Sequence, residues 1–126
     1  MPSTYSTSLR LELIGNGEQA GNWGYTTNTN LGTLLEQAIT GVINVPMVGS
    51  TTLTVGNGVS DQSRNAVLVL TGTLASAADL IVPTVNKLYT VRNATSNGQT
   101  VTVKTSAGTG VAITNGYTQL VYCDGT

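Results

Sequence analysis

Short runs of Val, Thr, Leu and Ile, separated by glycine-containing turns, dominate the sequence from residue 42 onward. They read VINVPMV, TTLTV, AVLVLTG, DLIVP, KLYTVRN, QTVTVKT, GVAIT and TQLVYC. Runs of this length and composition are typical of β-strands. Asn-Gly at 57–58, 97–98 and 115–116 favours hairpins, because both residues tolerate positive φ. Short strands with frequent turns predict an antiparallel β-sandwich of the jelly-roll kind, and we find no convincing internal repeat.

The apolar pattern differs between these runs. QTVTVKT alternates strictly, with Val101 and Val103 on one face and Thr100 and Thr102 on the other. AVLVL and DLIVP are continuously apolar, which is typical of strands buried on both faces. The single cysteine, Cys123, falls in the last run and is expected to be a buried thiol.

Residues 1–41 have a different composition from residues 42–126, so we predict an N-terminal attachment region followed by a β-sandwich domain. A polar arm at 2–8 leads into LRLELI at 9–14, where leucine alternates with charged residues. This alternation predicts a half-buried strand.

NLGTLLEQAITG, at residues 30–41, changes to the helical period. Asn30 is expected as the N-cap, and Gly41 is expected to end the helix in a left-handed conformation. The residues spaced i, i+3, i+4, i+7 and i+8 on one helix face are Leu31, Leu34, Leu35, Ala38 and Ile39. So short a helix is unstable alone, so its apolar stripe must pack either on its own sheet or on other copies of the chain.

The glycine-rich turn before this helix invites comparison with a phosphate-binding loop. Gly15, Gly17 and Gly21 do not have the G-x-G-x-x-G spacing, and the expected helix starts too late to point at a phosphate. We therefore predict a structural turn and no cofactor. Trp23 is expected to plug this turn against the helix rather than to stack on a ligand.

Charged residues are scarce, and this excludes several classes of function. Only 9% of the residues are charged, against about 25% in ordinary domains. The five basic residues are scattered, so a nucleic-acid partner is not expected. With no histidine, one cysteine and dispersed carboxylates, we predict neither a metal site nor an enzyme. No stretch approaches the roughly 20 apolar residues of a membrane helix, so no membrane partner is expected.

The end of the sequence suggests a larger protein. TQLVYC predicts a strand and Asp124-Gly125 a hairpin turn, yet the sequence stops at Thr126 before a returning strand. We expect this to be the N-terminal piece of a longer polypeptide. An intact mass near 13.0 kDa for the native protein would contradict this expectation.

The first 41 residues resemble the opening of many tailed-bacteriophage virion proteins, often labelled tail fibre or structural protein. In such proteins a leucine strand is followed by G-x-G-E-x-x-G-x-W-G, then T-N-x-N, then a helix with L-E-x-A-I-x-G. The matching positions are Gly15, Gly17, Glu18, Gly21, Trp23, Gly24, Thr27, Asn28, Asn30, Leu35, Glu36, Ala38, Ile39 and Gly41. The segments LYTVRNATSNGQTVTVKTSAGTGVAI and LVYCDGT are similar to the β domain that follows, so the resemblance covers nearly the whole chain.

The resemblance implies a homotrimeric appendage with its N-terminus toward the particle. We predict the N-terminal domain of a tail fibre, which attaches the fibre to a tail adaptor, nozzle or baseplate protein and supports host adsorption. Host-receptor contact is expected only through a region beyond Thr126. The protein is expected in the virion, as part of a tail appendage, after synthesis in the host cytoplasm.

Two groups of residues carry these expectations. Particle attachment is assigned to Tyr5, Leu9 and Leu11, and trimer or core packing to Trp23, Leu31, Leu34, Leu35 and Ile39. The polar arm at 2–8 is expected to be flexible, which would suit a threefold fibre on a tail of different symmetry.

Two alternatives remain. A head fibre or capsid decoration protein would also be trimeric, but a decoration protein should end soon after residue 126 whereas a fibre should run on. A carbohydrate-binding module would present a row of exposed aromatic side chains, yet the chain has only one Trp, five Tyr and no Phe.

Overall fold

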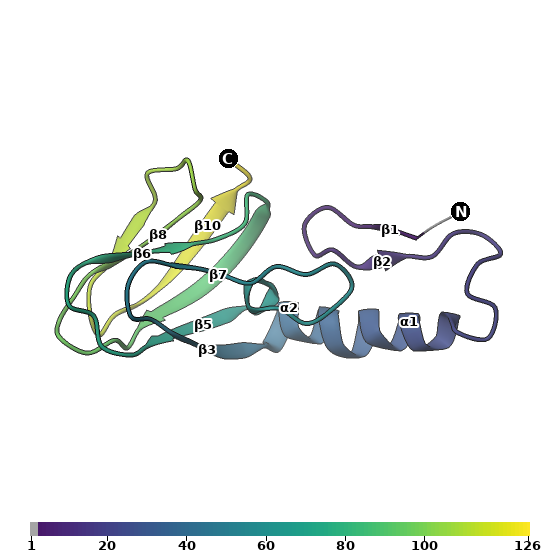
Figure 1. Ribbon diagram of the computed structural model, residues 1–126, viewed down its shortest axis with the longest axis horizontal. Coiled ribbons are helices and arrows are strands. Elements are labelled where there is room, and N and C mark those ends of the chain that lie inside the picture. Colours follow the sequence, from purple (N-terminus) through teal and green to yellow (C-terminus); the bar gives the residue numbers. More distant parts are fainter. Residues whose placement is uncertain (1–2) are drawn as a thin grey trace.

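The computed structural model describes residues 3–126 (Figure 1). Its helical segments are α1 (Trp23–Thr29), the π-helix η1 (Asn30–Leu35), α2 (Glu36–Thr40) and the 3-10 helix η2 (Gln62–Arg64). Its strands are β1 (Thr4–Tyr5), β2 (Glu12–Leu13), β3 (Val42–Pro46), β4 (Thr51–Thr52), β5 (Val67–Thr71), β6 (Ala78–Ile81), β7 (Asn86–Asn93), β8 (Val101–Lys104), β9 (Val111–Ile113) and β10 (Thr118–Asp124). The prediction of a mainly β chain is confirmed.

A single long helix runs from Trp23 to Thr40, because α1, η1 and α2 follow one another without a break in helical backbone conformation. In Figure 1 it projects from the β-sheets along the long axis of the molecule, beside the β1-β2 hairpin. The residue that precedes its first turn is Asn22. The prediction of Asn30 as the N-cap is therefore wrong, and Asn30 lies in the middle of the helix.

The helix ends next to Gly41 as predicted, but the conformation of this glycine is different. Its φ of −66° and ψ of 135° are extended rather than left-handed. Glycine is required here by space, because a Cβ would touch the carbonyl oxygen of Gln37 and lie 2.5 Å from Oδ1 of Asn65. The chain thus passes directly from the helix into β3 at Val42.

The N-terminal segment forms a hairpin instead of a flexible arm followed by a strand. Thr4 and Tyr5 pair antiparallel with Leu13 and Glu12, and the chain turns between them. Pro2, the first residue of the expected arm, lies outside the described residues. The predicted strand at 9–14 is wrong except at its Glu12–Leu13 portion, since the turn occupies the preceding residues.

The β domain consists of two four-stranded sheets, ordered β10-β7-β5-β3 and β4-β6-β8-β9. From β3 to β8 the chain alternates between the sheets, and each strand pairs parallel with the strand two positions later. Only the β7-β10 and β8-β9 pairs of these sheets are antiparallel. The prediction of an antiparallel sandwich is therefore wrong, because the sheets are mixed. The continuously apolar runs belong to β5 and β6, and each lies between two parallel neighbours.

This winding gives the chain a structural repeat that the sequence does not display. Val42 pairs with Val67 and Val67 with Thr90, so successive turns in one sheet are offset by 25 and 23 residues. In the other sheet Ala78 pairs with Val101, again an offset of 23 residues. The statement that no internal repeat exists holds for residue identity and is wrong for backbone geometry.

The three Asn-Gly pairs do not form the predicted hairpins. Asn97 and Gly98 do adopt positive φ, 80° and 67°. They connect β7 with β8, however, and these strands belong to different sheets. The pair at 115–116 likewise connects β9 with β10 across the two sheets, and the pair at 57–58 lies in the loop before η2.

A single apolar core fills the space between the two sheets. Its fully buried members include Leu68 and Val91 from one sheet and Leu80 and Val101 from the other. Cys123 is a free thiol, 9% exposed, on the inward side of β10, which confirms the expected buried strand cysteine.

Candidate assembly surface

All three residues predicted to attach the chain to the particle lie in the N-terminal hairpin. Tyr5 is on β1, and Leu9 and Leu11 follow in the turn, where both are half-buried. Tyr5 is 42% exposed. Its ring lies over Gly58, where an added Cβ would be only 3.0 Å from Cε1 of the tyrosine. The hairpin therefore rests on the loop before η2.

The residue that fixes this hairpin is Arg10, not one of the leucines. Arg10 is 8% exposed, and its Nη2 lies 2.9 Å from Oδ2 of Asp61 and 2.9 Å from Oγ of Ser63. Its Nε donates to the carbonyl oxygen of Gly56 at 3.2 Å. The backbone of Arg10 has a φ of 53°, and its carbonyl oxygen accepts from the N–H of Gly58. The predicted alternation is thus reversed, since the arginine is buried while Leu13 is 50% exposed.

Asp61 is the centre of this buried cluster. Its Oδ2 also accepts from the N–H of Gly56 at 2.7 Å, and its Oδ1 accepts from the N–H of Arg64 at 2.8 Å. Arg64 is fully buried, and its Nη2 lies 3.3 Å from Oδ2 of the same aspartate. Two arginines therefore depend on one carboxylate for charge compensation.

The surroundings of Asp61 keep it ionised. Burial alone raises the pKa of a carboxyl group, but the hydrogen bond from Gly56 and the hydrogen bond and charge of Arg10 outweigh this effect. The pKa of Asp61 therefore lies below its ordinary value of 3.8. Burial acts in the opposite sense on the neighbouring cations and lowers the pKa of Arg64 and of Lys87.

The hairpin is tied to the helix by amide side chains. Nδ2 of Asn30 donates to the carbonyl oxygen of Glu12 at 2.8 Å, and Oδ1 accepts from the Glu12 N–H at 3.1 Å. Nε2 of Gln19 donates to Oε1 of Glu12 at 2.6 Å, and its Oε1 accepts from the hydroxyl of Thr26. The inward side of the helix is thus largely polar.

The outward side of the helix is apolar. Of the residues assigned to trimer or core packing, only Leu34 is fully buried, and Leu35 is half-buried. Leu31 is 58% exposed and Ile39 is 73% exposed. The π-helical segment η1 takes more residues per turn than an α-helix, which rotates Leu34 away from Leu31. We call the row Leu31, Leu35 and Ile39 the helix stripe.

Trp23 does not plug the glycine-rich turn. It is 61% exposed at the start of α1, and Tyr25 beside it is 76% exposed. The turn instead closes on its own backbone, with the N–H groups of Asn22 and Trp23 both 2.8 Å from the carbonyl oxygen of Gln19. The predicted burial of Trp23 is therefore wrong for the single chain.

The glycine-rich turn leads into the helix sooner than the sequence suggested. Since the helix starts at Trp23, two residues after Gly21, the late start expected for it is wrong. The strand before the turn, β2, pairs antiparallel with β1 rather than entering a parallel sheet with a crossover helix. This arrangement differs from the βαβ unit that binds dinucleotides.

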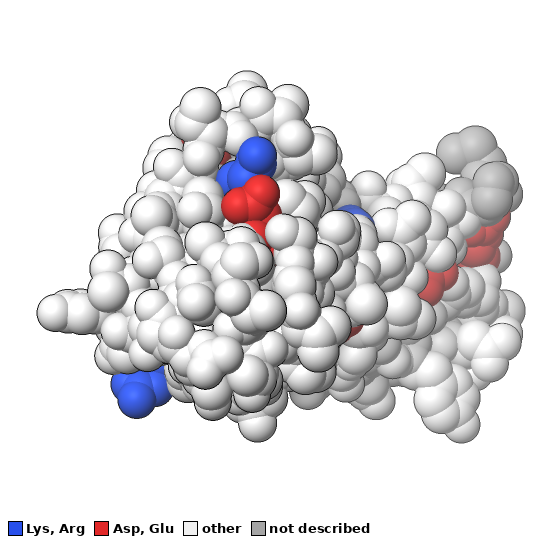
Figure 2. Space-filling view, turned by 60° about the vertical axis from the view of Figure 1, so that its left-hand side comes forward, with Lys and Arg blue, Asp and Glu red and all other residues white. Residues whose placement is uncertain are grey.

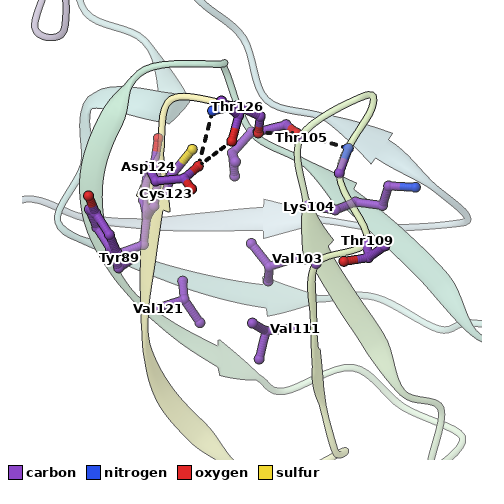
Figure 3. Close-up of a pocket in the computed structure, with 14 residues that line it drawn as sticks. Tyr89, Val103, Lys104, Thr105, Thr109, Val111, Val121, Cys123, Asp124 and Thr126 are labelled. Carbon is purple, nitrogen blue, oxygen red and sulfur yellow. Dashed lines mark hydrogen bonds between the residues drawn. The ribbon is translucent and has the colours of Figure 1, made fainter.

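A cavity of about 300 Å³ opens between the end of β10 and the β8-β9 hairpin (Figure 3). Val103 and Val121 form part of its apolar wall, and Figure 3 shows both side chains directed into it. At its rim the hydroxyl of Thr105 donates to the carbonyl oxygen of Thr126 at 2.7 Å. The lining contains one carboxylate side chain, that of Asp124, so it lacks the paired carboxylates used in acid–base catalysis.

In comparisons with known proteins, no family model, no curated protein and no solved structure matches the chain. Within residues 3–126, no helix is long and apolar enough to cross a membrane. Over the same range, no group of three or more His, Cys, Asp and Glu side chains is placed to hold a metal ion. Function must therefore be inferred from the surface of the chain and its sequence motifs.

The sequence analysis did not identify Arg10, Asp61 and Arg64 as a cluster. One signal was available, since a chain with only five basic residues has one of them between two leucines, at Leu9-Arg10-Leu11. A scarce charge in an apolar setting is often a buried, paired charge. Its partner 51 residues away carried no comparable signal.

Proposed function

We propose that this chain is the N-terminal domain of a bacteriophage tail fibre, assembled as a homotrimer and attached to the tail. The observation that carries the proposal is the helix Trp23–Thr40, which turns its polar side toward its own hairpin and the helix stripe toward solvent. An exposed apolar row on a helix is typical of a surface that a partner covers. The resemblance of residues 1–41 to the opening of phage virion proteins supports placing that partner in a virion.

The hairpin is the proposed point of contact with the tail, through an adaptor, nozzle or baseplate protein. It lies beside the helix, away from the β-sheets (Figure 1), and includes Tyr5, Leu9 and Leu11. The buried Arg10–Asp61 pair holds it on the β domain, so a load on the hairpin would pass into the sheets. The function is mechanical, and host receptors would be bound by a region beyond Thr126.

Immunogold labelling of purified virions tests the location. An antibody raised against residues 42–126 is expected to label the tail appendages, with pre-immune serum as the control. Label on the capsid would support the head-fibre or decoration alternative, and absence of the protein from virions would overturn the proposal. Binding of this domain to a glycan array, lost in a folded Trp23→Ala variant, would instead indicate a carbohydrate-binding module.

A further inference from the structure

The outward side of sheet β10-β7-β5-β3 carries an apolar row that crosses all four strands. Strand pairing aligns Val42 with Val67, Val67 with Thr90, and Thr90 with Leu120. The adjoining pair on β7 and β10 is Leu88 with Tyr122. We call this surface the outer face and define it by Val42, Val67, Val69, Leu88, Thr90, Leu120 and Tyr122.

Exposure on the outer face is high for side chains of this kind. Val42 is 64%, Leu88 58%, Leu120 65% and Tyr122 68% exposed. Val67 and Val69 are only half-buried, although their strand has the continuously apolar sequence typical of burial on both faces. In the single chain, the inward side of this sheet is covered by the other sheet and the outward side is not.

The charges favour a second copy of this chain as the covering partner. Among the outward residues of these four strands, Arg92 lies at one end of the β7-β10 pair and Asp124 at the other. The residues between them are uncharged, so two outer faces can approach without net repulsion, and a charged partner finds no counterpart. Figure 2 shows how few charged groups interrupt the surface on one side of the molecule.

We propose that the outer face is the main contact between copies of this chain, with the helix stripe extending it. The inference rests on the self-association part of the proposed function. The two surfaces are continuous, because Ile39 precedes Val42 by three residues at the junction of helix and β3.

The exposed apolar area agrees with this assignment. At roughly 100 Å² per aliphatic and 200 Å² per aromatic side chain, the four exposed residues of the outer face present roughly 300 Å². Leu31, Ile39 and the two aromatic residues at the start of α1 add roughly 400 Å² on the same scale. A stable interface buries about 800 Å² per partner, so the helix alone is too small and the two surfaces together approach the requirement.

Sedimentation equilibrium of the purified chain tests the proposal. The wild-type protein is expected to sediment at three times 13.0 kDa, and Leu120→Glu is expected to weaken association by at least about 100-fold, because it buries an unpaired carboxylate. Val48→Glu is the matched control, since Val48 is 94% exposed in the loop after β3 and lies off the outer face. Circular dichroism and urea unfolding check the fold of each variant. Leu88→Lys, on the neighbouring strand, replaces Leu120→Glu if that variant does not fold.

The outcomes separate this inference from the proposed function. If Leu120→Glu associates as strongly as Val48→Glu while Leu31→Glu is monomeric, the helix alone joins the copies and the inference is overturned. Virion labelling would still stand in that case. A monomeric wild-type chain, including one that binds another virion protein through Leu120, overturns both the inference and the homotrimer, but not the location in the tail.

Discussion

At the scale of single residues, the buried cluster around Asp61 shows how a chain with few charges uses them. Arg10 and Arg64 both lie within ion-pair distance of its Oδ2, and all three residues are at most 9% exposed. Such a cluster contributes less by the attraction itself than by the cost of breaking it, because an unpaired buried charge is strongly unfavourable. Asp61 is therefore the most sensitive position in the joint between hairpin and β domain.

Asp61→Asn is expected to lower the free energy of unfolding by about 3 kcal/mol, since it leaves two buried arginines without a counter-charge. Urea unfolding at neutral pH measures the change. Asp79→Asn, a half-exposed position on β6, is the control and is expected to change stability by less than about 0.5 kcal/mol. Equal effects of the two substitutions would show that the cluster does not hold the fold together.

Stability should also depend on pH through the same residue. The pKa of Asp61 is lower in the folded chain than its ordinary value of 3.8, so the unfolded chain takes up the proton first as pH falls. The stabilisation is therefore present above about pH 4 and is lost as pH falls through the folded pKa. Urea unfolding over a pH series is expected to show a smaller acid loss in Asp61→Asn than in the wild type. Parallel pH curves for the two proteins would contradict this prediction.

At the scale of elements, the helix shows what periodicity can and cannot predict. The i, i+3, i+4 pattern correctly predicted a helix that ends next to Gly41. It did not predict that the helix begins at Trp23, because residues 23–29 contain Gly, Thr and Asn, which are weak helix formers. Tertiary contacts with the hairpin compensate for this weakness, and Asn30 makes two of them.

Asn30→Ala distinguishes this tertiary role from helix propensity. Propensity alone would make the substitution stabilising, whereas loss of both hydrogen bonds to Glu12 is expected to cost about 1–2 kcal/mol. Hydrogen exchange of the Glu12 amide is expected to accelerate as the hairpin separates from the helix. Asn28→Ala, at an exposed position of the same helix, is the control and should leave that exchange rate unchanged. Slower exchange in Asn30→Ala would contradict the proposed tie.

At the scale of the whole molecule, the low charge predicts how copies associate. A chain with 9% charged residues and a net charge of −1 has little electrostatic contribution to self-association. The association constant is therefore expected to change less than about threefold between 0.1 M and 1 M salt, although the Debye length falls from about 10 Å to 3 Å. Sedimentation at the two salt concentrations measures this. A steep decrease in association with salt would indicate an interface built on ion pairs.

The sequence by itself determined the β-rich composition of residues 42–126, the presence of a helix before Gly41, the burial of Cys123 and the near absence of charge. These follow from local patterns, since alternation, helical period and composition can be read within a few residues. Only the tertiary structure decided which strands are neighbours, that Arg10 rather than Leu13 is buried, and that Leu34 points inward while Ile39 faces solvent. Each depends on contacts between residues far apart in the chain: parallel partners lie 23 to 25 residues apart in the sheet β10-β7-β5-β3, and Arg10 and Asp61 are 51 apart. A local pattern fixes which side chains share a face, but not what that face will meet.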